Sequence, residues 1–488
     1  MKRVARFGSL VIIVVALGGA LGCGNEAPGA GAIPSGAEQA ATFGPLHTTG
    51  RWIRDKDHRT VILRGINVGS RSKLPPFLPF DHTSSLDQLV QWGLNSVRLL
   101  FTWEGVEPSE GHYDEGYLDR LAAIVEACEA RGLMVILDSH QDIYARNFCG
   151  DGFPAWSVHP DYRDETCPGP LHLWPLSYVT SAGVIRSFDR FWDDPGLRAA
   201  YIRMMVHVAD RLASYPAVVG MDLLNEPFDL SYFLFDGSFE QNSLVPFYRD
   251  LIAALRERRP DLTIFYGTTG LFSVGFPTFL GPVGMPNLVF AAHWYDLFSL
   301  LSGVRSDTSA LRRRLEEMAE LASLWDVPVW IGEYGVPTNR TDTIDSLADQ
   351  IDLLEEYLFG SAIWTYNPTE VDWNEENTSL VYPGGAEKPH VNILVRPYPS
   401  RVAGTPTRFA YQKEAGVLEL SFVADPDARG PTEIVLPYRT YPAGIEVEAP
   451  DGVWQWDERR RVLLYEAPGD GLVHTIRVGP ASPSLTPR

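Results

Sequence analysis

Basic residues are scarce in this 488-residue chain, where 41 lysines and arginines stand against 62 acidic residues, a net charge of −21. Lys2, Arg3 and Arg6 lie in a segment that we expect to be removed, so the mature chain is more acidic still. Nucleic acids and anionic lipids are bound through clustered lysine and arginine side chains that neutralise phosphate. The charge balance therefore argues against a nucleic-acid partner.

Cysteine is also rare, with four in the chain, and no two of them have the Cys-x-x-Cys spacing of many metal sites. Cys128 falls on the apolar face of a helical pattern and is expected to be a small buried residue. Cys149 and Cys167 flank one loop, and in an exported protein we predict a disulfide between them. A cysteine metal site is the weaker alternative, and we expect neither a metal nor a cofactor.

Long hydrophobic runs are confined to the N-terminus, where the apolar run Phe7–Leu21 follows a basic start. This run is short for a bilayer, which favours a cleaved signal over a transmembrane helix. Ala20-Leu21-Gly22-Cys23 resembles a bacterial lipoprotein box, in which Cys23 is acylated; an ordinary signal peptide is the alternative. We expect a signal peptide at 1–22, a flexible linker at 23–45, and export to the cell envelope or secretion.

From residue 46, short apolar strands alternate with amphipathic helices, which predicts a parallel α/β architecture. Eight such units predict a (β/α)8 TIM barrel over residues 46–390. A doubly wound sheet is the alternative, but no glycine-rich phosphate turn follows the first strand. The predicted strands are Val61–Val68, Ser96–Phe101, Met134–Ser139, Val219–Asn225, Thr263–Gly267, Leu288–His293, Val329–Glu333 and Ala362–Tyr366. The predicted helices include Tyr117–Arg131, Leu197–Ser214, Val245–Arg259, Ser309–Leu324 and Thr343–Tyr357.

The pattern changes after about residue 390, where short strands with turn signals replace the strand–helix alternation. The predicted strands are Gly416–Val423, Thr432–Leu436, Gly444–Glu448, Arg461–Tyr465 and Val473–Val478. We therefore predict a C-terminal β-sandwich domain over residues 391–488.

Polar side chains stand at the ends of the predicted barrel strands, where barrel enzymes place their catalytic residues. Glu226 follows the fourth strand and Glu333 ends the seventh. Retaining glycosidases need two carboxyl groups about 5 Å apart, one to protonate the leaving oxygen and one to attack the sugar carbon. The other polar residues at these ends are Arg98, His140, Asp142, Asn225, His293, Tyr295 and Trp364. Metal binding by His140 and Asp142 is a weaker alternative, because no third ligand has a suitable spacing.

Leu224-Asn225-Glu226-Pro227 and Ile331-Gly332-Glu333-Tyr334-Gly335 together resemble the clan of retaining glycosidases that contains family 5. The resemblance extends, in the same order along the chain, to Asn95-Ser96-Val97-Arg98, His293-Trp294-Tyr295 and Trp364. It implies that Glu226 is the acid/base and Glu333 the nucleophile.

Position predicts roles for the neighbouring residues. Arg98 would pair with Glu333 and hold it ionised, and Tyr295 could donate a hydrogen bond to the same carboxylate. Asn225 would bind the sugar 2-hydroxyl, a contact that strengthens in the transition state. Glu226 must begin protonated, with its pKa raised by the second carboxylate. His140 and Trp364 would bind hydroxyls and stack on the sugar ring, while His293 and Trp364 each have a plain core role as the alternative.

A closer resemblance is to endoglycoceramidase-like members of family 5, which release glycans from ceramide. It rests on Arg64-Gly65-Ile66-Asn67-Val68, Ser72-Lys73-Leu74-Pro75-Pro76-Phe77, Trp103-Glu104-Gly105-Val106-Glu107-Pro108, Asp138-Ser139-His140-Gln141-Asp142 and Arg396-Pro397-Tyr398-Pro399. Ser139 departs from the methionine of many relatives, which bears on substrate preference. The resemblance implies that Lys73 and Asp142 contact the glycan and that the chain hydrolyses the bond between glycan and ceramide by double displacement.

Loops after four predicted strands are unusually apolar, as a glycolipid hydrolase requires: Leu74–Phe80, Phe228–Phe235, Leu271–Leu280 and Leu297–Leu301. Each buried methylene contributes about 0.8 kcal/mol, and such loops also suit contact with a membrane. The alternative is that these loops pack on each other or on the sandwich. A different family 5 target (a steryl-β-glucosidase, glucosylceramidase or endo-β-glucanase) and a non-catalytic carbohydrate-binding lipoprotein also remain open. We expect a monomer.

Overall fold

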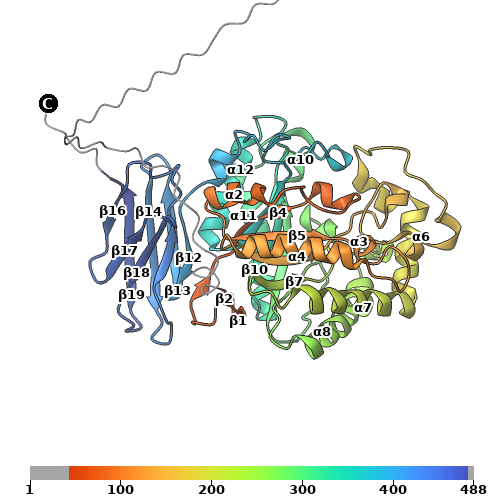
Figure 1. Cartoon of the computed structure of the whole chain (residues 1–488), viewed down its shortest axis with the longest axis horizontal. Coiled ribbons are helices and arrows are strands. Elements are labelled where there is room, and N and C mark those ends of the chain that lie inside the picture. Colours follow the sequence, from red (N-terminus) through yellow and green to blue (C-terminus); the bar gives the residue numbers. More distant parts are fainter. Residues whose placement is uncertain (1–42, 482–488) are drawn as a thin grey trace, which may run out of the picture.

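The structure is a computed structural model that describes residues 43–481. Cys23, the predicted signal peptide and most of the predicted linker therefore lie outside the described residues. Across the described part of the chain, no helix is long and apolar enough to cross a membrane. Figure 1 shows two strand-rich layers at one end of the molecule and a barrel surrounded by helices at the other.

Eight parallel strands close into a barrel in the order β10-β11-β4-β5-β6-β7-β8-β9. Closure confirms the predicted TIM barrel and rules out the doubly wound sheet, which would leave two open edges. The strands are β4 (Arg64–Val68), β5 (Ser96–Phe101), β6 (Met134–Ser139), β7 (Val218–Asp222), β8 (Ile264–Tyr266), β9 (Leu288–Tyr295), β10 (Val329–Gly335) and β11 (Gly360–Tyr366).

Helices cover the outside of the barrel, and their apolar faces join the strands in one large core. Several begin at a capping aspartate: the side chain of Asp194 accepts hydrogen bonds from the backbone of Gly196 and Leu197 at the start of α7. The helices are α2 (Leu86–Gln91), α3 (Trp103–Val106), α4 (Glu115–Glu129), α5 (Ser177–Thr180), α6 (Ala182–Asp193), α7 (Pro195–Leu212), α8 (Val245–Arg258), α9 (Gly270–Ser273), α10 (Leu297–Ser302), α11 (Thr308–Trp325), α12 (Ile344–Tyr357) and α13 (Val391–Leu394).

The second domain consists of two antiparallel sheets, with the strand orders β1-β2-β3-β12-β15-β18-β17 and β13-β14-β19-β16. They enclose a second core that includes Phe422, Ile434 and Tyr465. The strands are β1 (His47–Thr49), β2 (Trp52–Arg54), β3 (Thr60–Val61), β12 (Tyr398–Val402), β13 (Gly404–Gln412), β14 (Val417–Ala424), β15 (Thr432–Val435), β16 (Ile445–Glu448), β17 (Val453–Asp457), β18 (Val462–Glu466) and β19 (Val473–Pro480).

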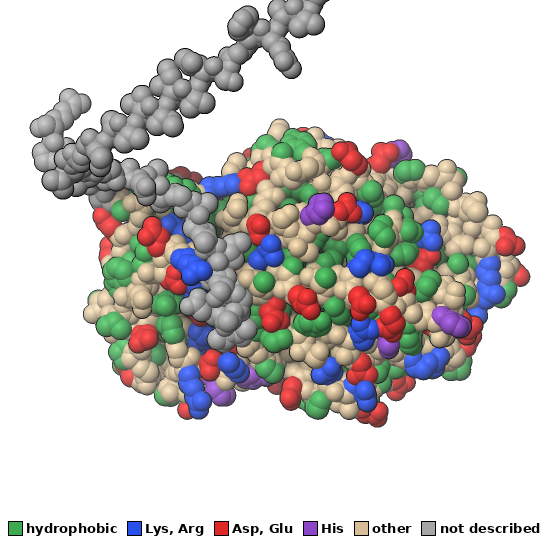
Figure 2. Space-filling model, viewed as in Figure 1, with side chains coloured by type: hydrophobic (Ala, Val, Ile, Leu, Met, Phe, Trp, Pro, Cys, Tyr) green, Lys and Arg blue, Asp and Glu red, His purple; other side chains and the backbone are tan. Residues whose placement is uncertain are grey.

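Both ends of the described chain build this second domain. The N-terminal strands β1 to β3 extend its larger sheet through the pairing of Val61 with Arg401, and Figure 1 shows β1 and β2 beside the C-terminal strands. The predicted strands did not include β12 and β13, which carry Pro399 and Pro406, because proline weakens the sequence signal of a strand. Figure 2 shows acidic and basic side chains interspersed over one face of the molecule.

Candidate active site

Arg98 lies inside the barrel on β5, with its side chain fully buried. Its guanidinium donates to Glu333 Oε1 at 2.7 Å, to Asp138 Oδ1 at 2.8 Å and to Asp222 Oδ2 at 3.0 Å. It also donates to the side-chain oxygen of Asn225 at 3.0 Å. Burial disfavours the charge, but the three carboxylates outweigh it and raise the pKa of Arg98. The guanidinium therefore joins strands β5, β6, β7 and β10 beneath the mouth of the barrel.

Glu226 and Glu333 face each other across His293. Its Nδ1 atom lies 2.8 Å from Glu226 Oε1 and 3.6 Å from Glu333 Oε2, and ligand atoms of all three groups lie within 4.8 Å of one another. The Tyr295 hydroxyl donates to Glu333 Oε2 at 2.9 Å. The separation of the two carboxyl groups fits the retaining geometry, because inverting enzymes need room for a water between them.

Glu226 follows β7 in a turn, since the strand ends at Asp222 and not at Asn225 as predicted. Its backbone adopts φ 41°, a left-handed conformation that is uncommon for residues other than glycine. Burial raises the pKa of Glu226, and the charge of Glu333 adds to this, while the hydrogen bond and charge of His293 oppose it. Glu226, whose pKa is raised, therefore lies opposite a Glu333 that is paired with Arg98.

The same three residues have the types and spacing of a metal site, but each already has another polar partner. Glu333 accepts from Arg98 and Tyr295, and Glu226 lies within hydrogen-bond distance of His293. Burial disfavours an imidazolium, yet Glu333 and Glu226 raise the pKa of His293. A cation at this position would have to displace the Arg98 guanidinium, 2.7 Å from Glu333, or meet its charge.

Lys73, Asp142 and Glu376 form a buried polar cluster at the same mouth of the barrel. Lys73 Nζ lies 2.6 Å from Asp142 Oδ2 and 3.2 Å from Glu376 Oε1, and its side chain is 1% exposed. Glu376 also accepts from Trp364 Nε1 at 3.0 Å. Burial raises the pKa of Glu376 to about 7, against the opposing charge of Lys73. The ring of His140 stacks on Trp364 at 5.3 Å between centroids, so this predicted pair adjoins the cluster.

The structure adds three residues to the predicted site. Asp138 and Asp222 are charged residues inside barrel strands, where a buried carboxylate requires a cationic partner. That partner is Arg98. Glu376 lies in an irregular segment after β11, where no periodic pattern marks a side chain as inward-facing.

Apolar side chains are exposed on the loops beyond Glu226. The exposed fraction is 66% for Leu234 after β7, 38% for Phe276 after β8, and 70% for both Phe298 and Leu301 after β9. The loop after β4 differs, because Phe80 is buried. Three of the four predicted apolar loops therefore expose large apolar side chains, whereas the fourth exposes Pro75 and Pro76 and buries its end at Phe80.

A disulfide joins Cys149 to Cys167 in the long segment after β6, the pair predicted from the sequence. Cys128 is buried on α4.

Comparison with known proteins follows the same division of the chain. The model of cellulases of glycosyl hydrolase family 5 matches residues 55–370, and that of the glycoside hydrolase family 5 C-terminal domain matches residues 396–478. Endoglycoceramidase I of Rhodococcus hoagii is 28% identical over 462 residues, which cover 89% of this chain and 88% of the relative. A glucosylceramidase of Cryptococcus neoformans is 24% identical over 624 aligned residues, covering 80% of this chain and 84% of the relative.

Among solved structures, endo-glycoceramidase II from a Rhodococcus species in complex with ganglioside GM3 is 31% identical, with a TM-score of 0.79. The match covers 89% of this chain and all of that one. With both family models matched and the barrel and second domain in agreement with them, the chain belongs to glycoside hydrolase family 5 and is a glycosidase.

Proposed function

We propose that this chain is a retaining β-glycosidase that cleaves the bond between glycan and ceramide in glycosphingolipids. The observation that carries the proposal is the pair Glu226 and Glu333, with atoms within 4.8 Å of one another, in a barrel whose loops after β7, β8 and β9 expose apolar side chains. A polysaccharide hydrolase needs polar and aromatic groups on its leaving-group side, whereas a lipid leaving group needs apolar ones. The named activities of the relatives above support the same substrate class.

The reaction proceeds in two displacements. Glu333 attacks the anomeric carbon while Glu226 gives its proton to the glycosidic oxygen, so that the lipid alcohol leaves and a glycosyl ester of Glu333 forms. Glu226, now ionised, takes a proton from water, whose oxygen attacks the same carbon and releases the glycan and Glu333. The raised pKa of Glu226 suits the first step, since a carboxyl group must hold a proton before it can give one.

Three neighbouring side chains assist Glu226 and Glu333 in this reaction. Arg98 and Tyr295 both donate to Glu333, which orients the nucleophile for its attack. The side-chain oxygen of Asn225 accepts from Arg98, and its amide nitrogen donates to Gln141 O at 3.0 Å, leaving a second amide proton for a sugar hydroxyl.

The setting of the enzyme belongs to the same proposal. An exported monomer anchored in the bacterial envelope through acylated Cys23 would meet its lipid substrate at a membrane surface. The exposed rim formed by Leu234, Phe298 and Leu301 would enter the interface, because apolar side chains gain free energy on leaving water.

The test is the product profile on a panel of lactosylceramide, glucosylceramide, a steryl glucoside and a soluble β-glucan. Intact disaccharide plus ceramide is the expected result, and replacing Glu333 with alanine should lower kcat about a thousandfold or more. The exposed Glu414 supplies a matched control, Glu414→Ala, which should leave kcat unchanged. Cleavage of the β-glucan alone would overturn the glycolipid proposal and leave the glycosidase chemistry in place.

A further inference from the structure

Two loops from strands that are not neighbours meet over the buried Lys73 cluster. One is the disulfide loop, residues 149–176 after β6, and the other is the β11 loop, residues 369–378. In the barrel, β4 and β5 stand between β6 and β11, so the two loops must cross above them. We call their junction the loop bridge.

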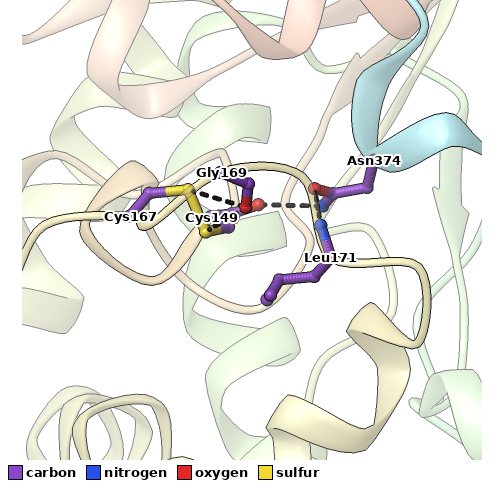
Figure 3. The surroundings of a disulfide bond; sticks show 5 residues. All are labelled: Cys149, Cys167, Gly169, Leu171 and Asn374. Carbon is purple, nitrogen blue, oxygen red and sulfur yellow. Dashed lines mark hydrogen bonds between the residues drawn. A yellow bond between two sulfur atoms is a disulfide. The ribbon is translucent and has the colours of Figure 1, made fainter.

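Asn374 makes the central contacts of the loop bridge. Its amide nitrogen donates to Cys149 O at 2.9 Å, and its amide oxygen accepts from the backbone nitrogen of Leu171 at 3.0 Å. Figure 3 shows this side chain reaching from the β11 loop to both partners beside the disulfide with Cys167. Asn374 is buried and adopts φ 47°, a left-handed conformation that asparagine tolerates better than most residues.

Two side-chain pairs extend the junction on either side of Asn374. His172 Nδ1 lies 3.2 Å from Glu375 Oε2, and both groups are exposed. The rings of Trp174 and Trp373 meet edge to face at 5.1 Å between centroids. Trp373 covers Lys73, whose Nζ atom lies 3.9 Å from its ring centre. The bridge therefore forms the roof of the Lys73 cluster.

The loop bridge covers the part of the barrel mouth between β11 and β6, whereas Glu226 follows β7. The lipid leaves from the side of Glu226, because the acid must reach the leaving oxygen, so the glycan extends the other way. On that other side, the side chains of Lys73, Asp142 and Glu376 are each at most 9% exposed beneath the bridge. Their charges suit the hydroxyl groups of a second sugar, and the bridge stands directly over them.

We propose that the loop bridge limits how far the glycan can extend past the Lys73 cluster, so that this chain acts on lipids with short glycans and discriminates against longer ones. This inference rests on the glycosphingolipid activity proposed above and names the part of that class the site accepts. Opening the bridge should then admit a longer glycan without changing the chemistry at Glu226 and Glu333.

The experiment compares kcat/KM for lactosylceramide with that for a ceramide bearing four sugars, in the same detergent micelles. The wild type should favour the two-sugar substrate about tenfold or more, the scale of one steric or contact difference in a binding site. Asn374→Ala and His172→Ala should each lower this preference, with Asn374→Ala having the larger effect because it removes both central hydrogen bonds. His207→Ala is the matched control, since His207 pairs with Glu115 at 2.7 Å between outer helices, away from the mouth.

Reduction of the wild type provides a second arm if Asn374→Ala fails to fold. Cleaving the Cys149–Cys167 disulfide frees the disulfide loop, so a reductant should also lower the preference. Equal kcat/KM on both substrates by the wild type would overturn the inference, as would a preference that every opened form retains. Loss of all ceramide substrates, with an aryl β-glycoside still cleaved, would instead refute the proposed function and the inference with it.

Discussion

Several single residues act on the catalytic pair without being placed to touch a substrate. A Cβ atom at Gly270, the first residue of α9, would lie 2.3 Å from Glu226 Oε2, so this position must be glycine for the acid/base to keep its place. His293 lies between the two carboxyl groups and sets the proton affinity of Glu226. Residues of this kind change the rate through geometry and charge.

We expect Gly270→Ala to lower kcat about a hundredfold while the free energy of unfolding changes little. The atom that the new methyl group meets is the tip of a flexible side chain, which can move at small cost to stability. Such a shift misplaces the proton donor, and misplacement by about 1 Å lowers the catalytic rate on the order of a hundredfold. Gly281→Ala is the control, because a Cβ atom there has only open space around it. Kinetics on an aryl β-glycoside and a denaturant titration provide the measurements; unchanged kcat would contradict the argument.

Replacing His293 with alanine should move the alkaline limb of the pH profile of kcat/KM to higher pH. Glu226 must be protonated to act, and its pKa is raised by burial but held back by the hydrogen bond and charge of His293. Without His293 the pKa of Glu226 rises further, so the acid keeps its proton to a higher pH. A limb that stays in place, or moves toward acid, would show that Glu226 does not control it. His207→Ala should leave the profile unchanged.

At the scale of elements, the long loops after the barrel strands carry both the substrate preference and much of the local stability. The disulfide loop contains three short 3-10 helices with hydrogen bonds of their own; the Cys149–Cys167 link closes it, and Asn374 joins it to the β11 loop. The loops after β7 and β9 instead expose apolar side chains beside Glu226. One barrel therefore presents a roofed polar side and an open apolar side.

The double variant Cys149→Ser and Cys167→Ser should lower the free energy of unfolding by about 3 kcal/mol. The link closes a loop of 18 residues, and removing it restores that much chain entropy to the denatured state. A denaturant titration measures the loss. Wild type in reductant should match the double variant, and the double variant should not respond to reductant. A loss below about 1 kcal/mol would show that the link hardly constrains the denatured chain.

At the scale of the whole molecule, the second domain ties the two ends of the described chain together. Glu433 on β15 lies 2.9 Å from Arg59, next to β3, and 3.2 Å from Arg401 on β12. Tyr398 of the same sheet donates to Gly93 O of the barrel at 3.0 Å. The Glu433 contacts hold this sheet together, and the Tyr398 contact joins it to the barrel, so the two domains should unfold together.

Glu433→Gln should destabilise the protein at neutral pH and do so less as the solution becomes acidic. Burial raises the pKa of Glu433, but Arg401, Arg59 and Arg460 outweigh it and hold that pKa below its ordinary value. A depressed pKa stabilises the fold above the ordinary carboxyl range, and that contribution disappears as pH falls through the folded value. At neutral pH the loss of a buried charge partner should cost about 3–5 kcal/mol. Chemical denaturation from neutral pH down to about pH 3, below the ordinary carboxyl range, follows how this cost falls. Glu448→Gln is the control, because Glu448 pairs with Arg477 at the surface. If the difference in the free energy of unfolding between wild type and Glu433→Gln does not change with pH, the assigned role of the Glu433 charge is contradicted.

The sequence by itself determined the features that are local and periodic. Alternating strands and helices predicted the barrel, and motifs at strand ends predicted Glu226, Glu333, Arg98 and Tyr295, because neighbouring strand ends of a parallel barrel meet at one mouth. The N-terminal signal and Cys23 stay predictions, since they lie outside the described residues.

Only the tertiary structure decided the features that depend on residues far apart in the chain. It showed that β3 pairs with β12, that Asp138 and Asp222 complete the environment of Arg98, and that Glu376 pairs with Lys73 beneath the ring of Trp373. Asn374 lies 225 residues from Cys149, and nothing in either local sequence marks the other as its partner. Such contacts form when chain segments are brought together by packing in the core, which is why a pattern of period 2 or 3.6 cannot encode them.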